Sequence, residues 1–189
     1  MRLFVALGLS REVGLGLAGL VDEFRLADAT QRWVSPQNLH VTLKFMGEVD
    51  PDRLPCVTAA LAGVRLPEPV SLEFRGLGFF PNERRPSVIW VGIEAGPALA
   101  RLAREIDLAA ASCGVAREAR PFAPHLTLGR FSQARVPEPL RQQIARSKGR
   151  SFGGFAAGEF QLMESKLKST GAEYTTLRSF RFAEQGAER

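Results

Sequence analysis

Hydrophobic and polar positions in the first half of the chain follow the periods of a strand, a helix and a second strand. Residues 2–8 form a short apolar run typical of a buried strand. Ser10 is a suitable N-cap, and residues 13–24 then place their apolar side chains on one helical face. A polar stretch leads to a further strand, which begins at His40 and ends near Gly47. The pattern therefore predicts the order strand, helix, strand.

The second half of the chain repeats this order. Residues 88–93 have the pattern of a strand, Pro97 opens a helix that ends at Gly114, and another strand begins at His125. His125 lies 85 positions after His40, and the same shift carries the first predicted strand onto residues 88–93. The repeat indicates an internal duplication, with two similar lobes related by an approximate two-fold axis and a cleft where they meet.

Further elements lie around these repeats. They are a helix from Asp50-Pro51 to about Gly63, a strand over 70–74, a proline-bounded loop over 76–87, a helix over 138–146, and two closing strands over 159–167 and 174–182 joined by a turn at 169–171. At 189 residues the chain has ample length for a packed core, and we expect residues 1–189 to form one domain of two lobes.

The two strands that begin with histidine carry the same short motif. One reads His40-Val41-Thr42-Leu43 and the other reads His125-Leu126-Thr127-Leu128, and these are the only two histidines of the chain. Side chains two apart in a strand point to the same face. Each motif strand thus presents an imidazole and a hydroxyl together, with its apolar residues toward the core. We expect the two motif strands to lie next to each other and to hold one phosphate between them.

This set of side chains suits acid–base chemistry at phosphorus. Histidine has an ordinary pKa near 6.5, so one imidazole can take a proton from water while the other gives a proton to a leaving alkoxide. The threonine hydroxyls can donate hydrogen bonds to the non-bridging oxygens, where charge gathers in the transition state. A single His-x-Thr is more often structural, but two copies at matched positions favour catalysis. The scheme needs no cofactor, and two histidines without clustered cysteines or carboxylates make a poor metal site.

Composition narrows the class of partner. The formal net charge is +5 and arginine supplies most of the positive charge, which fits an anionic partner. No apolar run approaches the ~18 residues of a membrane span, and the N-terminus resembles a strand more than a signal peptide. We therefore expect a cytoplasmic protein, and a monomer. Cys56 and Cys113 have no metal-type spacing, and we expect two reduced, buried thiols, although a disulfide is not excluded.

The sequence resembles the two-histidine (2H) phosphoesterase superfamily. Within it, the chain is similar to the bacterial and archaeal RNA 2′,3′-cyclic phosphodiesterases, historically called 2′-5′ RNA ligases. The resemblance covers almost the whole chain, and it is carried by residues 2–6, 33–47, 122–128 and 162–167 with Gly171 and Tyr174. It implies an α+β fold of two lobes, each a small, mainly antiparallel sheet with helices on its outer face and the active-site cleft between them.

The resemblance also implies a reaction and roles for the motif residues. The reaction is metal-independent hydrolysis of RNA 2′,3′-cyclic phosphate ends to 2′-phosphates. His40 would be the general acid at the departing 3′ oxygen, His125 the general base for water, and Thr42 and Thr127 would hold the phosphate. From the residues alone, the two histidines are interchangeable in these roles.

Two further positions match the family. Phe45 would stack on the terminal base, and Arg130 would contact the phosphate. Each lies five residues past its histidine, which places it on the opposite face unless the strand twists or bulges. Core packing is an equal alternative for Phe45. Lys44 shares the strand parity of His40 and is expected to line the cleft.

Other functions stay open at this point. The same site could perform 2′-5′ ligation, the chain could be a non-catalytic module that binds RNA ends, and small cyclic nucleotides or ADP-ribose cyclic phosphates are alternative substrates. Further basic residues could bind RNA, although a solvated surface charge is the more common role; they are Arg84, Arg85, Arg117, Arg120, Arg146, Lys148 and Arg150.

Overall fold

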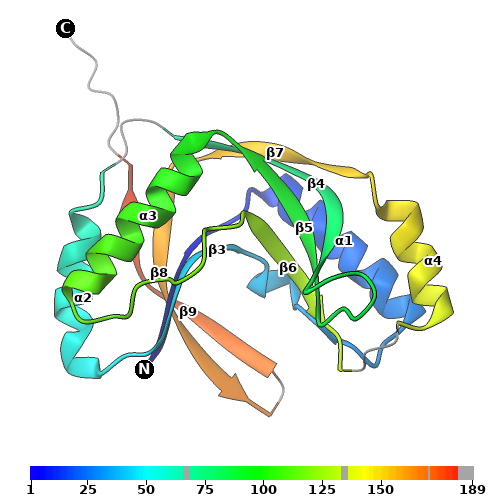
Figure 1. The fold of residues 1–189 in the computed structure, drawn as a ribbon, viewed down its shortest axis with the longest axis horizontal. Helices are drawn as coiled ribbons and strands as arrows, with labels where there is room; N and C mark the ends of the chain where they lie inside the picture. The colour runs from blue at the N-terminus through cyan, green and yellow to red at the C-terminus, as the bar shows by residue number, and fades with distance from the viewer. Residues whose placement is uncertain (66–68, 133–135, 170, 183–189) are drawn as a thin grey trace, which may run out of the picture.

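The computed structural model describes residues 1–65, 69–132, 136–169 and 171–182. Over these residues the chain forms strands, α-helices and two short 3-10 turns (Figure 1). In chain order they are β1 (Arg2–Leu7), α1 (Arg11–Ala27), β2 (Arg32–Trp33), η1 (Pro36–Asn38), β3 (Val41–Glu48), η2 (Pro51–Arg53), α2 (Leu54–Ala62), β4 (Val70–Phe80), β5 (Val88–Ala95), α3 (Pro97–Ser112), β6 (His125–Arg130), α4 (Glu138–Ser147), β7 (Ser151–Ala157), β8 (Glu159–Lys168) and β9 (Gly171–Arg181).

The strands form two antiparallel sheets, which confirms the predicted fold class. The first sheet has the order β3-β1-β8-β9, and the second has the order β2-β6-β5-β4-β7. The predicted repeat is visible in the pairing, because β1 pairs with β3 in the first sheet as β5 pairs with β6 in the second. Each motif strand is therefore paired with the first strand of its own repeat.

The helices, in contrast, are exchanged between the two halves. Helix α1 follows β1 of the first sheet but packs against β6 and β7 of the second sheet and against α4. Helix α3 follows β5 of the second sheet but packs against β3 of the first sheet and against α2 (Figure 1). Helices cover each sheet, as predicted. The helix that follows β1 covers the second sheet, however, and the helix that follows β5 covers the first sheet. This crossing fixes the two sheets relative to each other.

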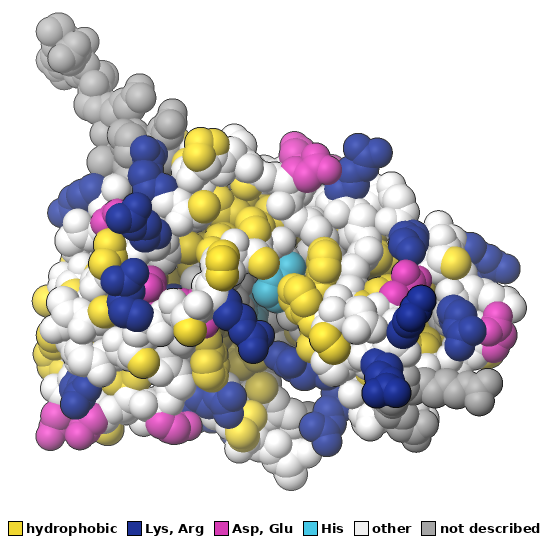
Figure 2. Space-filling model, viewed as in Figure 1, with side chains coloured by type: hydrophobic (Ala, Val, Ile, Leu, Met, Phe, Trp, Pro, Cys, Tyr) yellow, Lys and Arg dark blue, Asp and Glu magenta, His cyan; other side chains and the backbone are white. Residues whose placement is uncertain are grey.

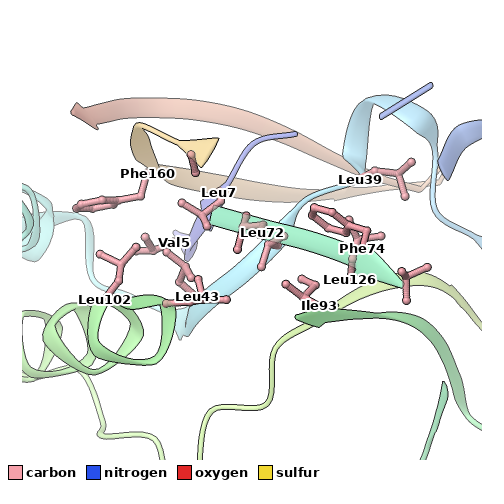
Figure 3. Close-up of a cluster of buried hydrophobic side chains, with 14 of the residues drawn as sticks. Val5, Leu7, Leu39, Leu43, Leu72, Phe74, Ile93, Leu102, Leu126 and Phe160 are labelled. Carbon is pink, nitrogen blue, oxygen red and sulfur yellow. The ribbon is translucent and has the colours of Figure 1, made fainter. Parts of the chain in front are cut away.

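The core follows the predicted apolar faces. Helix α1 buries the five side chains that its periodicity selects, and its N-cap hydroxyl of Ser10 accepts a hydrogen bond from the backbone N–H of Val13 at 3.3 Å. Figure 3 shows Leu102 of α3 pointing toward Val5 and Leu43 of the first sheet. Burial of such side chains contributes about 1.5–3 kcal/mol each, so this layer holds the motif strand β3 in place.

The strand predictions were incomplete, most of all in the second sheet. Strand β4 continues to Phe80 through the segment predicted as a loop, because Gly76 adopts a φ of +70° and the pairing with β5 resumes after a shift of register. Strand β7 was not predicted, because its adjacent glycines weaken the strand pattern. Gly154 is required there, since a Cβ would lie 2.4 Å from the carbonyl oxygen of Leu72.

The prediction of two reduced thiols was wrong. Cys56 of α2 and Cys113, the C-cap of α3, form a disulfide with their Cα atoms 5.9 Å apart. The two cysteines are 57 residues apart in sequence, and only the side-by-side packing of α2 and α3 brings them together.

Within the described residues, no helix combines the length and the apolar character needed to cross a membrane.

Candidate active site

The two motif strands meet at the centre of the molecule. Strands β3 and β6 belong to different sheets but contact each other, and a pocket of about 270 Å³ lies over them. Figure 2 shows histidine surface at the base of a hollow in the middle of the face, with Lys and Arg side chains nearby. The lining includes the six side chains to which the sequence assigned a catalytic or phosphate- or base-binding role, namely His40, Thr42, Phe45, His125, Thr127 and Arg130.

The two imidazoles are held in the same way. Nδ1 of His40 lies 2.6 Å from the carbonyl oxygen of Asn38, and Nδ1 of His125 lies 2.7 Å from that of Ala123. A carbonyl oxygen can only accept, so each Nδ1 carries a proton and donates it. In the neutral ring Nε2 then carries no proton, and its lone pair can accept a hydrogen bond. In His40 it lies 3.0 Å from Oγ1 of Thr42, which donates to it.

The surroundings of the two rings differ. His40 packs against Phe4 and Tyr174, with ring centroids 4.9 and 5.4 Å away. Burial disfavours the charged imidazolium and lowers the pKa of His40 below its ordinary value, and the hydrogen bond to Asn38 offsets this only in part. His125 contacts Phe80 edge-on at 5.0 Å but is more open to solvent. The pair is thus symmetric in the hydrogen bonds of Nδ1 and asymmetric in solvation.

Both motif strands contain a bulge at the same place. The pairing of β1 with β3 skips Leu43, and the pairing of β5 with β6 skips Leu128, which lies 85 positions later. The bulge shifts the side-chain alternation by one residue, so the positions that follow change faces. Both strands accordingly show the same order of exposure over six residues, from each histidine to the fifth position after it.

The bulge explains where the residues after each motif point. Phe45 and Arg130 line the pocket despite their odd spacing from the histidines, and the Phe45 side chain is 47% exposed. The expectation that Lys44 lines the cleft was wrong. Its side chain turns to the core, is 4% exposed, and forms an ion pair with Asp107 at 2.7 Å.

The pocket also contains residues that had no role in the sequence-based prediction. Arg2 of β1 lies over the Phe45 ring, 5.0 Å from its centroid, and Asn38, Ser165 and Tyr174 are further lining residues. They lie within the stretches that carry the family resemblance. Their place in the pocket depends on the pairing of β1 with β3 and β8, which periodicity alone does not reveal.

The other basic candidates lie elsewhere. Arg117 forms an ion pair with Asp107 and Arg150 forms one with Glu23, so both are engaged within the protein. Arg84, Arg85 and Lys148 line a separate groove. In the part of the chain that the structure describes, no group of three or more His, Cys, Asp or Glu side chains is placed to hold a metal ion.

Comparison with known proteins gives matches over almost the whole chain. The model of the family described as LigT like Phosphoesterase matches twice, at residues 7–90 and 91–174, in agreement with the duplication. An RNA 2′,3′-cyclic phosphodiesterase of Methanothermobacter thermautotrophicus is 32% identical over 96% of this chain and 98% of its own. One from Thermus thermophilus is 35% identical over 95% of this chain and 89% of its own.

Solved structures agree over the full length. A Thermus thermophilus protein superimposes with a TM-score of 0.80 at 33% identity, covering 99% of this chain and 100% of the other. Escherichia coli LigT complexed with 3′-AMP superimposes with a TM-score of 0.76 at 27% identity, covering 97% and 98%. The duplicated match and the relatives above 30% identity lead to one conclusion: this chain belongs to the LigT-like phosphoesterase family.

Proposed function

We propose that this protein hydrolyses RNA 2′,3′-cyclic phosphate ends to 2′-phosphates without a metal ion. The observation that carries the proposal is the pairing of the imidazoles: both line one pocket, and each has its Nδ1 occupied by a backbone carbonyl. Two such rings supply one proton acceptor and one proton donor on a shared substrate. The relatives named RNA 2′,3′-cyclic phosphodiesterases support the choice of substrate.

The reaction divides between the two rings. Nε2 of His125 takes a proton from water as the water oxygen bonds to phosphorus. The bond between phosphorus and the 3′ oxygen breaks, and Nε2–H of His40 gives its proton to that oxygen. The product carries a 2′-phosphate and a 3′ hydroxyl, and the rings return to their starting states by proton exchange with solvent. Each proton transfer contributes roughly 10²–10⁴-fold to the rate.

The other pocket residues stabilise the charge that develops on phosphorus. Thr42 and Thr127 share the face of the histidines, and their hydroxyls donate to the non-bridging oxygens. Arg130 adds charge-assisted hydrogen bonds from its guanidinium. Phe45, backed by Arg2, offers a ring face to the terminal base.

The lowered pKa of His40 has a consequence for its role as the acid. In the free protein the imidazolium of His40 is depleted at neutral pH, because burial favours the neutral ring. The anionic phosphate would favour the charged form and raise the pKa when substrate binds. Substrate binding therefore prepares the proton donor. Escherichia coli LigT, which shares this fold at 26% identity, has been solved in complex with phosphate, so an anionic ligand is known for a similar protein.

The decisive test is turnover of an RNA oligonucleotide that ends in a 2′,3′-cyclic phosphate. We expect a 2′-phosphate product, undiminished rates in excess chelator, and a loss of about 100-fold or more in His40→Ala and in His125→Ala. Both variants should keep the thermal unfolding midpoint of the parent within a few degrees. Full activity in either variant would refute the proposal. A 2′-5′-linked product from two oligonucleotides would favour ligation, and tight binding without turnover would favour an RNA-end binding module.

We further propose that the protein is a monomer and that it acts in the cytoplasm. Sedimentation equilibrium tests the first point. The disulfide allows the cytoplasmic location to be tested, because thiols of cytoplasmic proteins are reduced in most organisms. Alkylation of thiols in intact cells, followed by mass spectrometry, would report whether Cys56 and Cys113 are oxidised there.

A further inference from the structure

A second groove lies beside the catalytic pocket, between the loop that joins β4 to β5 and helix α4. We call it the α4 groove. It has a volume of about 740 Å³ and is larger than the catalytic pocket. Figure 1 shows the loop and α4 on the same side of the second sheet. The lining residues are Phe79, Glu83, Arg84, Arg85, Pro86, Val136, Arg141, Ile144, Ala145 and Lys148.

The groove has an apolar floor and a cationic rim. Its floor is formed by side chains such as Phe79 and Ile144, and its rim carries four cations against one lining carboxylate. That carboxylate, Glu83, is paired with Lys148 at 3.1 Å. Arg84 and Arg85 are exposed and have no carboxylate partner among the described residues. Because Arg141 is paired with Glu138, the uncompensated positive charge of the groove lies at Arg84 and Arg85.

Arg84 and Arg85 take part in the hydrogen bonds of their loop through their backbone and not through their side chains. The side-chain oxygen of Asn82 accepts hydrogen bonds from the backbone N–H groups of Arg84 and Arg85, at 3.0 and 3.1 Å. The hydroxyl of Ser87 also donates to the carbonyl oxygen of Phe80 at 2.9 Å, so the side chains of Arg84 and Arg85 are not needed for these hydrogen bonds of the loop. Both guanidinium groups remain free for a ligand, and either side chain can be replaced without removing the hydrogen bonds that shape the loop.

The groove and the catalytic pocket are linked through neighbouring residues. Arg130 lines the pocket, and its neighbour Phe131 stacks on Phe79, with ring centroids 6.4 Å apart, at the edge of the α4 groove. The backbone N–H of Phe131 also donates to the carbonyl of Ser87, which ties the end of β6 to the same loop. These contacts place the surface beside Arg130 next to the α4 groove, which is the arrangement that a polymer bound at both sites requires. A cationic groove with aromatic and apolar surface suits single-stranded RNA, which has both phosphates and ring faces.

We propose that the α4 groove binds the RNA chain upstream of the cyclic phosphate end, with Arg84 and Arg85 contacting its phosphates. The inference rests on the proposed function of the neighbouring pocket and adds to it a preference for polymeric over mononucleotide substrates. Binding in the groove lowers KM for RNA and leaves the chemical step at the pocket unchanged.

The test compares a nucleoside 2′,3′-cyclic phosphate with an oligoribonucleotide of about twelve residues that ends in the same group. In the double variant Arg84→Glu/Arg85→Glu, we expect kcat/KM for the oligonucleotide to fall roughly tenfold or more at low salt, mainly through KM. The dependence of log KM on log salt should become shallower by about 0.7 for each RNA phosphate that the variant no longer binds. Turnover of the mononucleotide should stay within about twofold, because nothing in the pocket changes.

A matched control is Arg101→Glu/Arg104→Glu on the exposed side of α3, which makes the same change in net charge on the other sheet. It should leave both substrates nearly unaffected. Equal loss in the two double variants, or no loss of oligonucleotide turnover in the groove variant, would overturn the inference. A parent protein that hydrolyses the mononucleotide but shows no preference for RNA would also overturn it and would leave the proposed function intact. A parent that hydrolyses neither substrate would refute the proposed function.

Discussion

Lys44 Nζ lies 2.7 Å from Oδ1 of Asp107, in the packed layer between β3 and α3. The same carboxylate accepts hydrogen bonds from Nε of Arg117 at 2.5 Å and from the backbone N–H of Glu118 at 3.0 Å. Residues 117 and 118 begin the segment that leads into β6. One buried carboxylate thus links the strand that follows His40 to the segment that positions His125.

Removal of this carboxylate charge should be strongly destabilising. In Asp107→Asn the ammonium group of Lys44 would stay buried without its counter-charge, so we expect a loss of about 3–5 kcal/mol in the free energy of unfolding, measured by urea denaturation. The control is Asp22→Asn, which breaks the exposed ion pair with Arg25 and should change stability by less than about 0.5 kcal/mol. Similar small effects in both variants would contradict the linking role of Asp107.

Acid should weaken the fold through the same carboxylate. Burial alone would raise the pKa of Asp107, but hydrogen bonds from Lys44 and Arg117 outweigh it and hold the pKa below the ordinary 3.8. Thr30 and Gln31 lower the pKa of Asp28 in the same way. As the pH falls, these carboxylates therefore take up protons at a higher pH in the unfolded chain than in the folded protein. The stability that these groups provide is complete above 3.8 and is lost as the pH drops through their folded pKa values.

Unfolding free energies measured from about pH 7.5 to about pH 2.5 would test this sign. The parent should lose stability steeply below about pH 4, and Asp107→Asn should show a shallower decline because its residue no longer titrates. His40 adds a contribution of the same sign at higher pH. Its pKa in the folded protein is lowered from 6.5, so protonation below 6.5 favours the unfolded chain. A parent that became more stable as the pH fell from 6.5 would contradict the assignment of His40, and one that became more stable below about pH 4 would contradict that of the carboxylates.

The disulfide should contribute to stability and not to catalysis. It closes a loop of 57 residues between α2 and α3, outside the pocket lining, and chain entropy gives about 4 kcal/mol for such a loop. We expect Cys56→Ser/Cys113→Ala to lose about 2–4 kcal/mol in urea unfolding, with kcat/KM unchanged. Addition of a reductant should lower the stability of the parent to that of the variant. Titration of two free thiols in the unreduced parent would show that the bond does not form in solution.

The sequence predicted the site better than it predicted the strand geometry around it. The motif residues, their shared face and the 85-residue repeat follow from strand periodicity, which is a local property of the chain. The side-chain directions of Lys44 and Phe45 do not, because a bulge at Leu43 reverses the alternation after Thr42. A bulge is a two-versus-one mismatch between paired strands, so it can be recognised only when the pairing is known.

Other differences have the same origin in non-local contacts. The disulfide depends on the packing of α2 against α3, and β7 depends on the pairing with β4. The exchange of α1 and α3 between the two sheets also leaves no trace in periodicity, because an apolar helical face does not specify which sheet it covers. Local patterns thus predicted most of the helices and strands. Which of them pair or pack together could be learned only from the structure.

Phe45 provides a direct test of the bulge. The ring is 47% exposed in the pocket, so its removal should reduce substrate binding without disturbing the core. We expect Phe45→Ala to raise KM for a cyclic nucleotide by an amount worth about 1–3 kcal/mol, with little change in kcat or in the thermal midpoint. Phe45→Trp should retain the stacking surface and a KM close to that of the parent. A large drop in stability with unchanged KM would instead assign Phe45 to the core.

The assignment of acid and base can be tested by changing the leaving group. A 4-nitrophenyl phosphodiester of a nucleoside releases a phenolate that needs no proton, so the general acid becomes dispensable while the base is still required. With this substrate, His40→Ala should recover most of the activity that it loses on the cyclic phosphate, and His125→Ala should not. The reverse result would exchange the two roles.

The pH profile supplies an independent check of the same assignment. With the cyclic phosphate, kcat/KM reports groups of the free protein, in which the pKa of His40 is lowered. If His40 is the acid, its active protonated form disappears as the pH rises, and the alkaline decline should begin below pH 6.5. With the nitrophenyl substrate this decline should vanish and the acidic limb, which reports the base, should remain. Persistence of the alkaline decline with both substrates would show that it does not arise from proton donation to the leaving oxygen.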